Sequence, residues 1–156
     1  MGTVSKYTIL AVDDEEQIRN LMVSFLSKMG YSYVTATDGL DALDKLKANK
    51  IDAVVTDAKM PHMDGIDLTL AISKEHPKLP IMISTAFGEE YTIATAICVG
   101  AREFIQKPFS FYEFAIRLRK MIHDSEVFRV RRTEEKEDKD LVGLRSELEQ
   151  ILQGVA

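Results

Sequence analysis

Residues 53–65 read AVVTDAKMPHMDG, a short apolar run that ends on Asp57 and leads into a turn. Three other short apolar runs also end on polar side chains, namely Asp13 with Asp14, Thr85 and Lys107. Most of these runs lack alternating polar residues, which is typical of parallel strands covered by helices on both faces. Because parallel strands present their carboxyl ends at the same edge of a sheet, we expect all five side chains in one pocket.

The first ~125 residues alternate short apolar runs with longer amphipathic segments, which predicts an α/β domain with a parallel sheet. The clearest predicted helix carries apolar residues at three- and four-residue spacing from Ile18 to Met29 and ends at Gly30. Further helices are predicted to begin near Gly39, after Gly65, near Glu89 and after Pro108. The patterns predict five strands and five helices.

The chain has 156 residues, enough for one substantial core, and a net charge of −5. Neither residues 1–124 nor the remainder of the chain is basic overall, so direct binding of nucleic acid is not expected. The single cysteine, Cys98, excludes an internal disulfide and fits a reducing compartment. No stretch resembles a signal peptide or reaches transmembrane length, so we expect a cytoplasmic protein that does not bind membranes.

Acidic residues follow the first and third predicted strands. Asp13 and Asp14 are adjacent, and two adjacent carboxylates are costly to ionise together without a cation. Mg²⁺ takes oxygen ligands and commonly binds one or two carboxylates directly. A carboxylate placed as Asp57 is placed can attack a phosphoryl group to form an acyl phosphate. Taken alone, the Asp13-Asp14 pair is equally well explained as a solvated acidic loop that caps the first helix, and an aspartate placed as Asp57 is usually only a turn former or a helix cap.

Thr85 adds a hydroxyl and Lys107 an ammonium to the same expected edge. The ammonium can pair with phosphoryl oxygens as an acyl phosphate forms. A single threonine or lysine at such a position is more often structural. The joint occurrence of these residue types in this order, each after its own strand, predicts a site for a divalent cation and a phosphoryl group.

These motifs resemble the response-regulator receiver family of two-component signalling over about residues 6–124. The matching elements are the Asp13-Asp14 pair, Asp57 followed by MPHMDG, Thr85-Ala86 and the KPF motif at 107–109. The resemblance implies a doubly wound sheet of strand order 2-1-3-4-5 with five helices, followed here by a C-terminal helical tail.

The resemblance also implies a role for each acidic residue. Asp57 is implied to be the phosphoacceptor. A cofactor ion, Mg²⁺ or Mn²⁺, is implied to be held by Asp14, Asp57 and the backbone carbonyl of Lys59, whereas Asp13 is implied to act mainly through a water molecule.

The remaining motif positions are implied to contact phosphate or to switch. Lys107 corresponds to the phosphate-contacting lysine, Thr85 to the switch hydroxyl and Phe104 to the aromatic switch residue. Because Phe104 lacks a hydroxyl, we expect it to prefer a buried position even without phosphate. The Lys107–Pro108 bond is cis in relatives and is expected to be cis here.

Two positions depart from the best-known members of the family. Lys59 lies two residues after Asp57, and Phe87 lies two residues after Thr85. These positions flank the path of water to the acyl phosphate in this family. Since neither side chain orients water well, we expect a long-lived acyl phosphate; the alternative is that both point to solvent without kinetic effect.

The sequence changes character after the expected receiver domain, residues 1–124. Residues 125–140 form a charged stretch, expected to be a helical or frayed linker, and residues 141–156 a short amphipathic helix. The apolar seam of this helix has heptad-like spacing and consists of Leu141, Leu144, Leu148, Ile151 and Val155. We expect the seam to pair with a second chain as a homodimer, with folding back onto the same receiver as the alternative.

The expected function is a two-component response regulator. A histidine kinase or phosphotransfer protein is expected to phosphorylate Asp57, which switches the fourth helix, fifth strand and fifth helix and controls partner binding or dimerisation. Such a chain catalyses only its own phosphorylation and dephosphorylation. The alternative is a Mg²⁺-dependent phosphohydrolase with Asp57 as nucleophile, although Lys59 stands where such enzymes carry an acid/base aspartate. A structural module with a vestigial pocket is a third interpretation, and the sequence leaves the cognate kinase and the output open.

Overall fold

We describe residues 7–86 and 88–153 from a computed structural model, leaving aside the side chains of residues 91, 128–142 and 144. The strands are β1 (Thr8–Val12), β2 (Ser32–Ala36), β3 (Ala53–Asp57), β4 (Ile81–Thr85) and β5 (Glu103–Gln106). The helices are α1 (Glu16–Lys28), α2 (Gly39–Ala48), α3 (Gly65–Glu75), α4 (Glu90–Val99) and α5 (Phe111–Gln153). Strands and helices alternate along the chain, as the sequence predicts.

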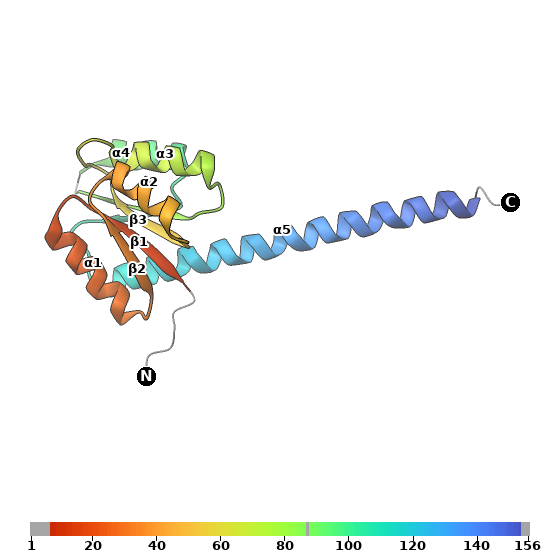
Figure 1. Ribbon diagram of the computed structural model, residues 1–156, viewed down its shortest axis with the longest axis horizontal. Helices are drawn as coiled ribbons and strands as arrows, with labels where there is room; N and C mark the ends of the chain where they lie inside the picture. Colours follow the sequence, from red (N-terminus) through yellow and green to blue (C-terminus); the bar gives the residue numbers. More distant parts are fainter. Residues whose placement is uncertain (1–6, 87, 154–156) are drawn as a thin grey trace. The chain divides into compact units, whose positions relative to one another are not determined.

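The five strands form one parallel sheet in the order β2-β1-β3-β4-β5 (Figure 1). The predicted fold class and strand order are therefore confirmed. The chain crosses from β1 outward to β2 and then returns to β3 on the other side of β1. This reversal makes the carboxyl ends of β1 and β3 the topological switch point, where ligands bind in sheets of this kind.

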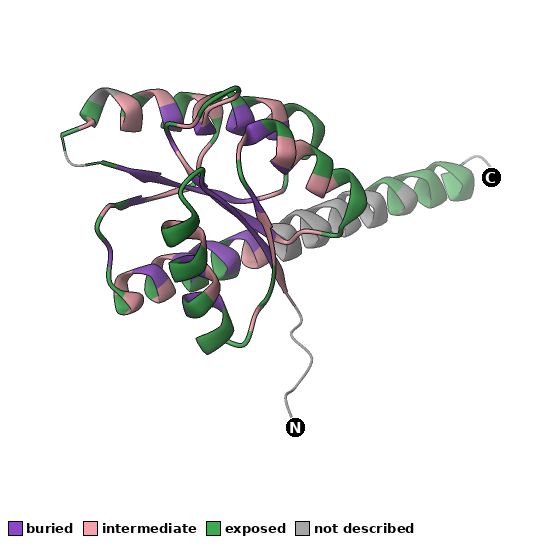
Figure 2. Ribbon diagram, turned by 60° about the vertical axis from the view of Figure 1, so that its left-hand side comes forward, coloured by how far each residue is buried: buried purple, intermediate pink, exposed green. Residues whose placement is uncertain are grey.

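Helices cover both faces of the sheet, and each face has its own apolar core. On one face α1 and the start of α5 cover the sheet, with Met22, Leu26 and Phe114 among the buried residues. On the other face α2, α3 and α4 cover it, with Leu68 and Ile72 among the buried residues. The three central strands, β1, β3 and β4, are buried on both sides (Figure 2), which explains why their sequences lack alternating polar residues.

The chain divides into two compact units, residues 1–122 and 123–156. The first unit holds the sheet and its covering helices. In the second unit the structure assigns helix from His123 through Gln153, as the continuation of α5 without a break at residue 125 or 140. The stretch expected as a linker is rich in Glu, Lys and Arg, which favour helix. Its separate role as a linker before a dimerisation segment stays a prediction.

No helix in the described ranges combines the length and the hydrophobicity needed to cross a bilayer.

The turn between β3 and α3 requires a residue without a side chain. Asp64 caps α3 by accepting a hydrogen bond from the Asp67 N–H at 2.8 Å, and the Gly65 N–H donates to the Ala58 carbonyl at 2.9 Å. A Cβ atom on Gly65 would collide with the backbone carbonyl of Asp57. The position of the Asp57 side chain therefore depends on the glycine that starts the next helix.

We expect Gly65→Ala to destabilise the chain by roughly 1–3 kcal/mol, because the added methyl group forces the backbone at Asp57 to move. Gly143→Ala is the matched control, since nothing lies within 4 Å of a Cβ there. That variant should leave stability unchanged or raise it by up to about 1 kcal/mol. Urea unfolding measures both variants, and equal stability of Gly65→Ala and the wild type would show that the turn tolerates a side chain.

Candidate functional site

Three carboxylates meet at the carboxyl edge of β1 and β3. Asp13 and Asp14 directly follow β1, and Asp57 is the last residue of β3. One oxygen from each lies within 4.8 Å of the others. Asp13 is buried, Asp14 is exposed, and the Asp57 side chain retains only 12% exposure. The sequence prediction that these three residues share one pocket is met by the geometry.

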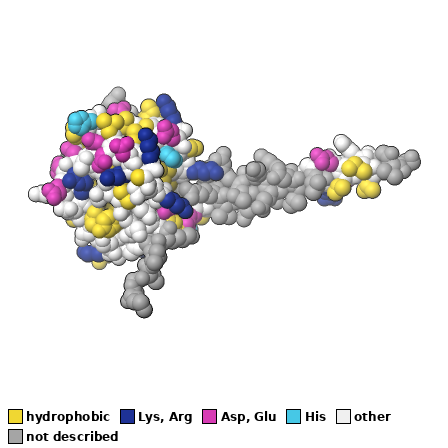
Figure 3. Space-filling model, viewed as in Figure 1, with side chains coloured by type: hydrophobic (Ala, Val, Ile, Leu, Met, Phe, Trp, Pro, Cys, Tyr) yellow, Lys and Arg dark blue, Asp and Glu magenta, His cyan; other side chains and the backbone are white. Residues whose placement is uncertain are grey.

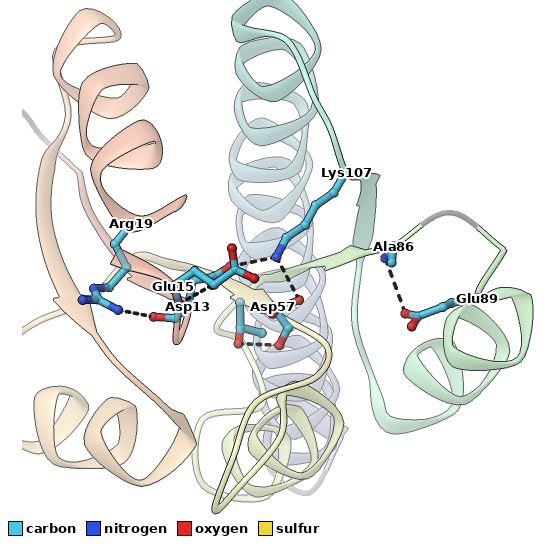
Figure 4. Close-up of polar contacts among 8 residues, drawn as sticks. Asp13, Glu15, Arg19, Asp57, Ala86, Glu89 and Lys107 are labelled. Atoms are coloured by element: carbon cyan, nitrogen blue, oxygen red, sulfur yellow. Dashed lines mark hydrogen bonds and ion pairs between the residues drawn. The ribbon is translucent and has the colours of Figure 1, made fainter. Parts of the chain in front are cut away.

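Lys107 follows β5 and reaches across the sheet edge into this cluster (Figure 4). Its Nζ lies 3.0 Å from Asp13 Oδ2 and 3.3 Å from Asp57 Oδ1. Its backbone N–H donates to the Thr85 carbonyl at 2.8 Å, and the Lys107–Pro108 bond is cis, as expected from the resemblance. The ammonium thus bridges two carboxylates that would otherwise repel each other.

Asp13 is held in place from several directions. Its Oδ1 accepts a hydrogen bond from the Glu15 N–H at 2.9 Å, and its Oδ2 accepts one from Lys107. The Arg19 guanidinium donates to the Asp13 carbonyl oxygen at 2.8 Å. Both carboxylate oxygens of Asp13 carry contacts, which agrees with an indirect role toward a metal ion, although that role stays a prediction.

The environment of Asp57 changes its acidity. Burial raises the pKa of Asp57 from 3.8 to about 6; the Lys107 charge opposes this rise, whereas the charges of Asp13 and Asp14 add to it. For Lys107, burial lowers the pKa, but the hydrogen bond to Asp13 and the charges of Asp57 and Asp13 outweigh it, so the pKa lies above its usual value. The pocket therefore holds an ionised lysine beside a carboxylate that is more basic than usual.

Thr85 and Phe104 lie on the neighbouring strands. Asp57 pairs in register with Ser84, so Thr85 stands one residue beyond the level of Asp57 on the adjacent strand, where it is buried. Phe104 lies in β5 and is half-buried against the core formed with α2, α3 and α4. The expected inward preference of Phe104 is thus met in part, and its role as a switch stays a prediction.

Lys59 makes a contact that the sequence analysis did not anticipate. Its Nζ lies 2.7 Å from Oε1 of Glu89, the residue just before α4. The other carboxylate oxygen of Glu89, Oε2, accepts a hydrogen bond from the Ala86 N–H at 3.4 Å. Sequence reasoning missed Glu89 because it belongs to no motif and its partner lies on a different loop. Phe87, the other residue expected to tune hydrolysis, lies outside the described residues.

The donor set fits a hard divalent cation. Three carboxylates converge on one point, and a single ammonium contacts two of them, so the cluster keeps excess negative charge. Carboxylate oxygens in this arrangement are the ligands that Mg²⁺ and Mn²⁺ take in proteins.

Comparison with known proteins agrees with this geometry. The sequence matches the response regulator receiver domain family over residues 9–135. The chain belongs to the response regulator receiver family. This receiver domain is 36% identical to the alkaline phosphatase synthesis transcriptional regulatory protein PhoP of Bacillus subtilis over 119 residues. The aligned region covers 76% of this chain and 50% of PhoP. The chain spans about half the length of the curated relatives it matches.

Solved structures give the same result. The NtrX protein of Brucella abortus superposes with a TM-score of 0.77 and 32% identity, covering 80% of this chain and 28% of NtrX. A response regulator receiver domain protein of Clostridium thermocellum superposes with a TM-score of 0.73 and 29% identity, covering 78% of this chain and 98% of that structure. The similarity therefore lies in the receiver domain.

The raised pKa of Asp57 predicts a cost to stability. A carboxyl group whose pKa is about 6 when folded and 3.8 otherwise destabilises the fold progressively as the pH rises between these values. Near neutral pH and without divalent cations, we expect Asp57→Asn to raise the free energy of unfolding by roughly 1–3 kcal/mol. Lys107 keeps Asp13 as a partner in this variant.

This gain should shrink as the pH falls from about 6 toward 3.8, because the wild-type carboxyl then becomes neutral. Urea unfolding in EDTA across this pH range measures the difference. Asp44→Asn, which changes an exposed carboxylate on α2, is the control and should show no such pH dependence. A gain that does not change with pH would show that the charge of Asp57 carries no penalty.

Proposed function

We propose that this receiver domain accepts a phosphoryl group on Asp57 in a reaction that requires a divalent cation. The observation that supports the proposal is the convergence of Asp13, Asp14 and Asp57 with Lys107 at the switch point of the sheet. The donor is proposed to be a histidine kinase or a phosphotransfer protein, in keeping with membership of the receiver family.

In the proposed reaction a carboxylate oxygen of Asp57 attacks phosphorus as the bond from phosphorus to the donor histidine nitrogen breaks. The electron pair of that bond leaves with the imidazole. Lys107, which contacts Asp57 at 3.3 Å, is positioned to offset the negative charge on the phosphoryl oxygens. Asp14, Asp57 and the backbone carbonyl of Lys59 would hold a bound Mg²⁺. The ion would neutralise charge on the phosphoryl oxygens and help to orient them.

The raised pKa of Asp57 is compatible with this role. A carboxylate with a pKa of about 6 is ionised near neutral pH and binds a proton, and by the same reasoning a phosphorus atom, more strongly than an ordinary carboxylate. The chain is proposed to act as a phosphoacceptor that catalyses only its own phosphorylation and dephosphorylation.

The response to phosphorylation is proposed to pass through Thr85 and Phe104. The Thr85 hydroxyl is proposed to move toward the phosphoryl group, and Phe104 to turn further into the space that this movement opens. The affected surface is formed by α4, β5 and α5, and it is proposed to control partner binding or dimerisation.

Acetyl phosphate with Mg²⁺ tests phosphoacceptance without a kinase. We expect one phosphoryl group on the wild type and none on Asp57→Asn. Labelling of Asp14→Ala should be greatly weakened and should require at least roughly tenfold more Mg²⁺, because a direct ligand is lost. Asp44→Asn is the control and should label normally. Intact-protein mass spectrometry reads out the label, and normal labelling of Asp57→Asn would refute the assignment.

The helical second unit is proposed to pair with a second chain. Leu148 and Ile151, two residues of the predicted seam, are 53% and 62% exposed, and Leu152 beside them is 74% exposed. Figure 3 shows hydrophobic side chains on the surface toward the C-terminal end of the described helix. Leu141 and Leu144 have side chains outside the described set, and Val155 lies outside the described residues. A seam of about two heptads is near the lower length limit for a stable isolated helix, and a partner surface would stabilise it.

Light scattering tests the pairing. We expect the full chain to form a dimer and Leu148→Lys to weaken it, because a charge in the seam opposes packing between helices. Gln150→Lys introduces the same charge at an exposed position outside the seam and is the control. If the full chain is monomeric in both the phosphorylated and the free state, pairing through the tail is wrong.

A further inference from the structure

Glu89 connects two loops at the edge of the pocket. It lies four residues after Thr85, and its two carboxylate oxygens contact different groups: Oε1 lies 2.7 Å from Lys59 Nζ, and Oε2 accepts the Ala86 N–H at 3.4 Å. The contact with Ala86 is visible in Figure 4. Lys59 belongs to the loop after β3, and Ala86 to the loop after β4.

The side chain of Glu89 does not cap the helix that follows it. Asp38 and Asp64, which occupy the same position before α2 and α3, each accept a hydrogen bond from an N–H three residues later. Glu89 makes no such bond within α4, and its carboxylate turns back toward Ala86 and Lys59. Support of α4 by capping therefore does not account for the direction of this side chain.

The two partners of Glu89 are neighbours in sequence of the phosphoryl site. Lys59 lies two residues after Asp57, and Ala86 directly follows Thr85. The Lys107 ammonium also acts on Glu89, since its charge is among the influences that lower the pKa of Glu89, after the hydrogen bond to Lys59. The Glu89 carboxylate thus acts on the same two ammonium groups, those of Lys59 and Lys107, that a phosphoryl group on Asp57 would attract.

The Lys59–Glu89 ion pair is suited to being broken. The Lys59 side chain is 72% exposed and that of Glu89 is 19% exposed, and ion pairs this open to solvent contribute little net stability. A phosphoryl group carries a charge of about −1.5 to −2 near neutral pH and three strong acceptor oxygens. It can therefore compete with a single carboxylate for the same ammonium.

We propose that Glu89 is a positioning residue for the chemistry at Asp57. The Glu89 carboxylate holds the Lys59 ammonium away from the pocket and competes for this ammonium with the phosphoryl group. The proposal rests on phosphorylation of Asp57. In the free chain the Lys59 ammonium pairs with Glu89, and after phosphorylation it exchanges between Glu89 and the phosphoryl oxygens. When Lys59 pairs with the phosphoryl oxygens, it obstructs the approach of water and slows hydrolysis. Glu89 draws Lys59 away and therefore shortens the lifetime of the acyl phosphate.

The decay rate of the phosphorylated chain, measured after removal of acetyl phosphate, tests the competition. Glu89→Gln keeps the size of the side chain but removes its charge, and we expect decay about two- to fivefold slower than in the wild type. In a Lys59→Met background the same Glu89→Gln change should have no effect, because the ammonium is gone. Glu90→Gln removes a charge from the adjacent exposed position and should decay like the wild type.

The outcomes separate the alternatives. Equal slowing by Glu89→Gln in both backgrounds would mean that loss of negative charge alone acts on the pocket, and it would overturn the competition. Unchanged decay in Glu89→Gln would also overturn it, and a fall in melting temperature without a change in decay would indicate a structural role. If the wild type takes up no phosphoryl group, the proposed function fails and this inference fails with it; labelled chains that decay alike contradict the inference alone.

Discussion

The contact of one ammonium with two carboxylates is the interaction on which this site depends. Lys107 lies 3.0 Å from Asp13 and 3.3 Å from Asp57, and without it the acidic cluster would contain only like charges. Burial disfavours the charged form of Asp57 and is the largest cause of its raised pKa; the charges of Asp13 and Asp14 add to the rise, and the Lys107 charge opposes it. The three carboxylates therefore keep negative charge that Lys107 does not balance, and a divalent cation would balance it and allow a phosphoryl group to bind.

The fold supplies this arrangement through its topology. In a parallel sheet all carboxyl ends lie at one edge, and the order β2-β1-β3-β4-β5 places β1 and β3 side by side at the centre. Lys107 comes from the outermost strand, β5, and its side chain extends back over the edge to reach Asp13 and Asp57. Gly65 allows α3 to start directly against the Asp57 carbonyl.

The sequence predicted the fold well because the three central strands are buried on both faces. Short apolar runs that end on polar side chains located the four strands that carry the five pocket residues, whereas β2 showed only a weak alternation. Glu89 could not be found in this way, because its role depends on Lys59, which lies on another loop and approaches it only in the folded chain. The continuation of α5 beyond residue 125 was open for a related reason: a charged stretch rich in helix-forming residues predicts either a helix or a frayed linker.

We propose that the carboxylate cluster and Lys107 form one site for a cation and a phosphoryl group. Titration calorimetry of Mg²⁺ into the chain, with and without the phosphoryl analogue beryllofluoride, measures this directly. We expect beryllofluoride to tighten Mg²⁺ binding and Mg²⁺ to tighten beryllofluoride binding by the same factor, because each ligand balances charge left by the other. Mg²⁺ affinity that beryllofluoride does not change would show that the two ligands do not share the site, and would contradict the account.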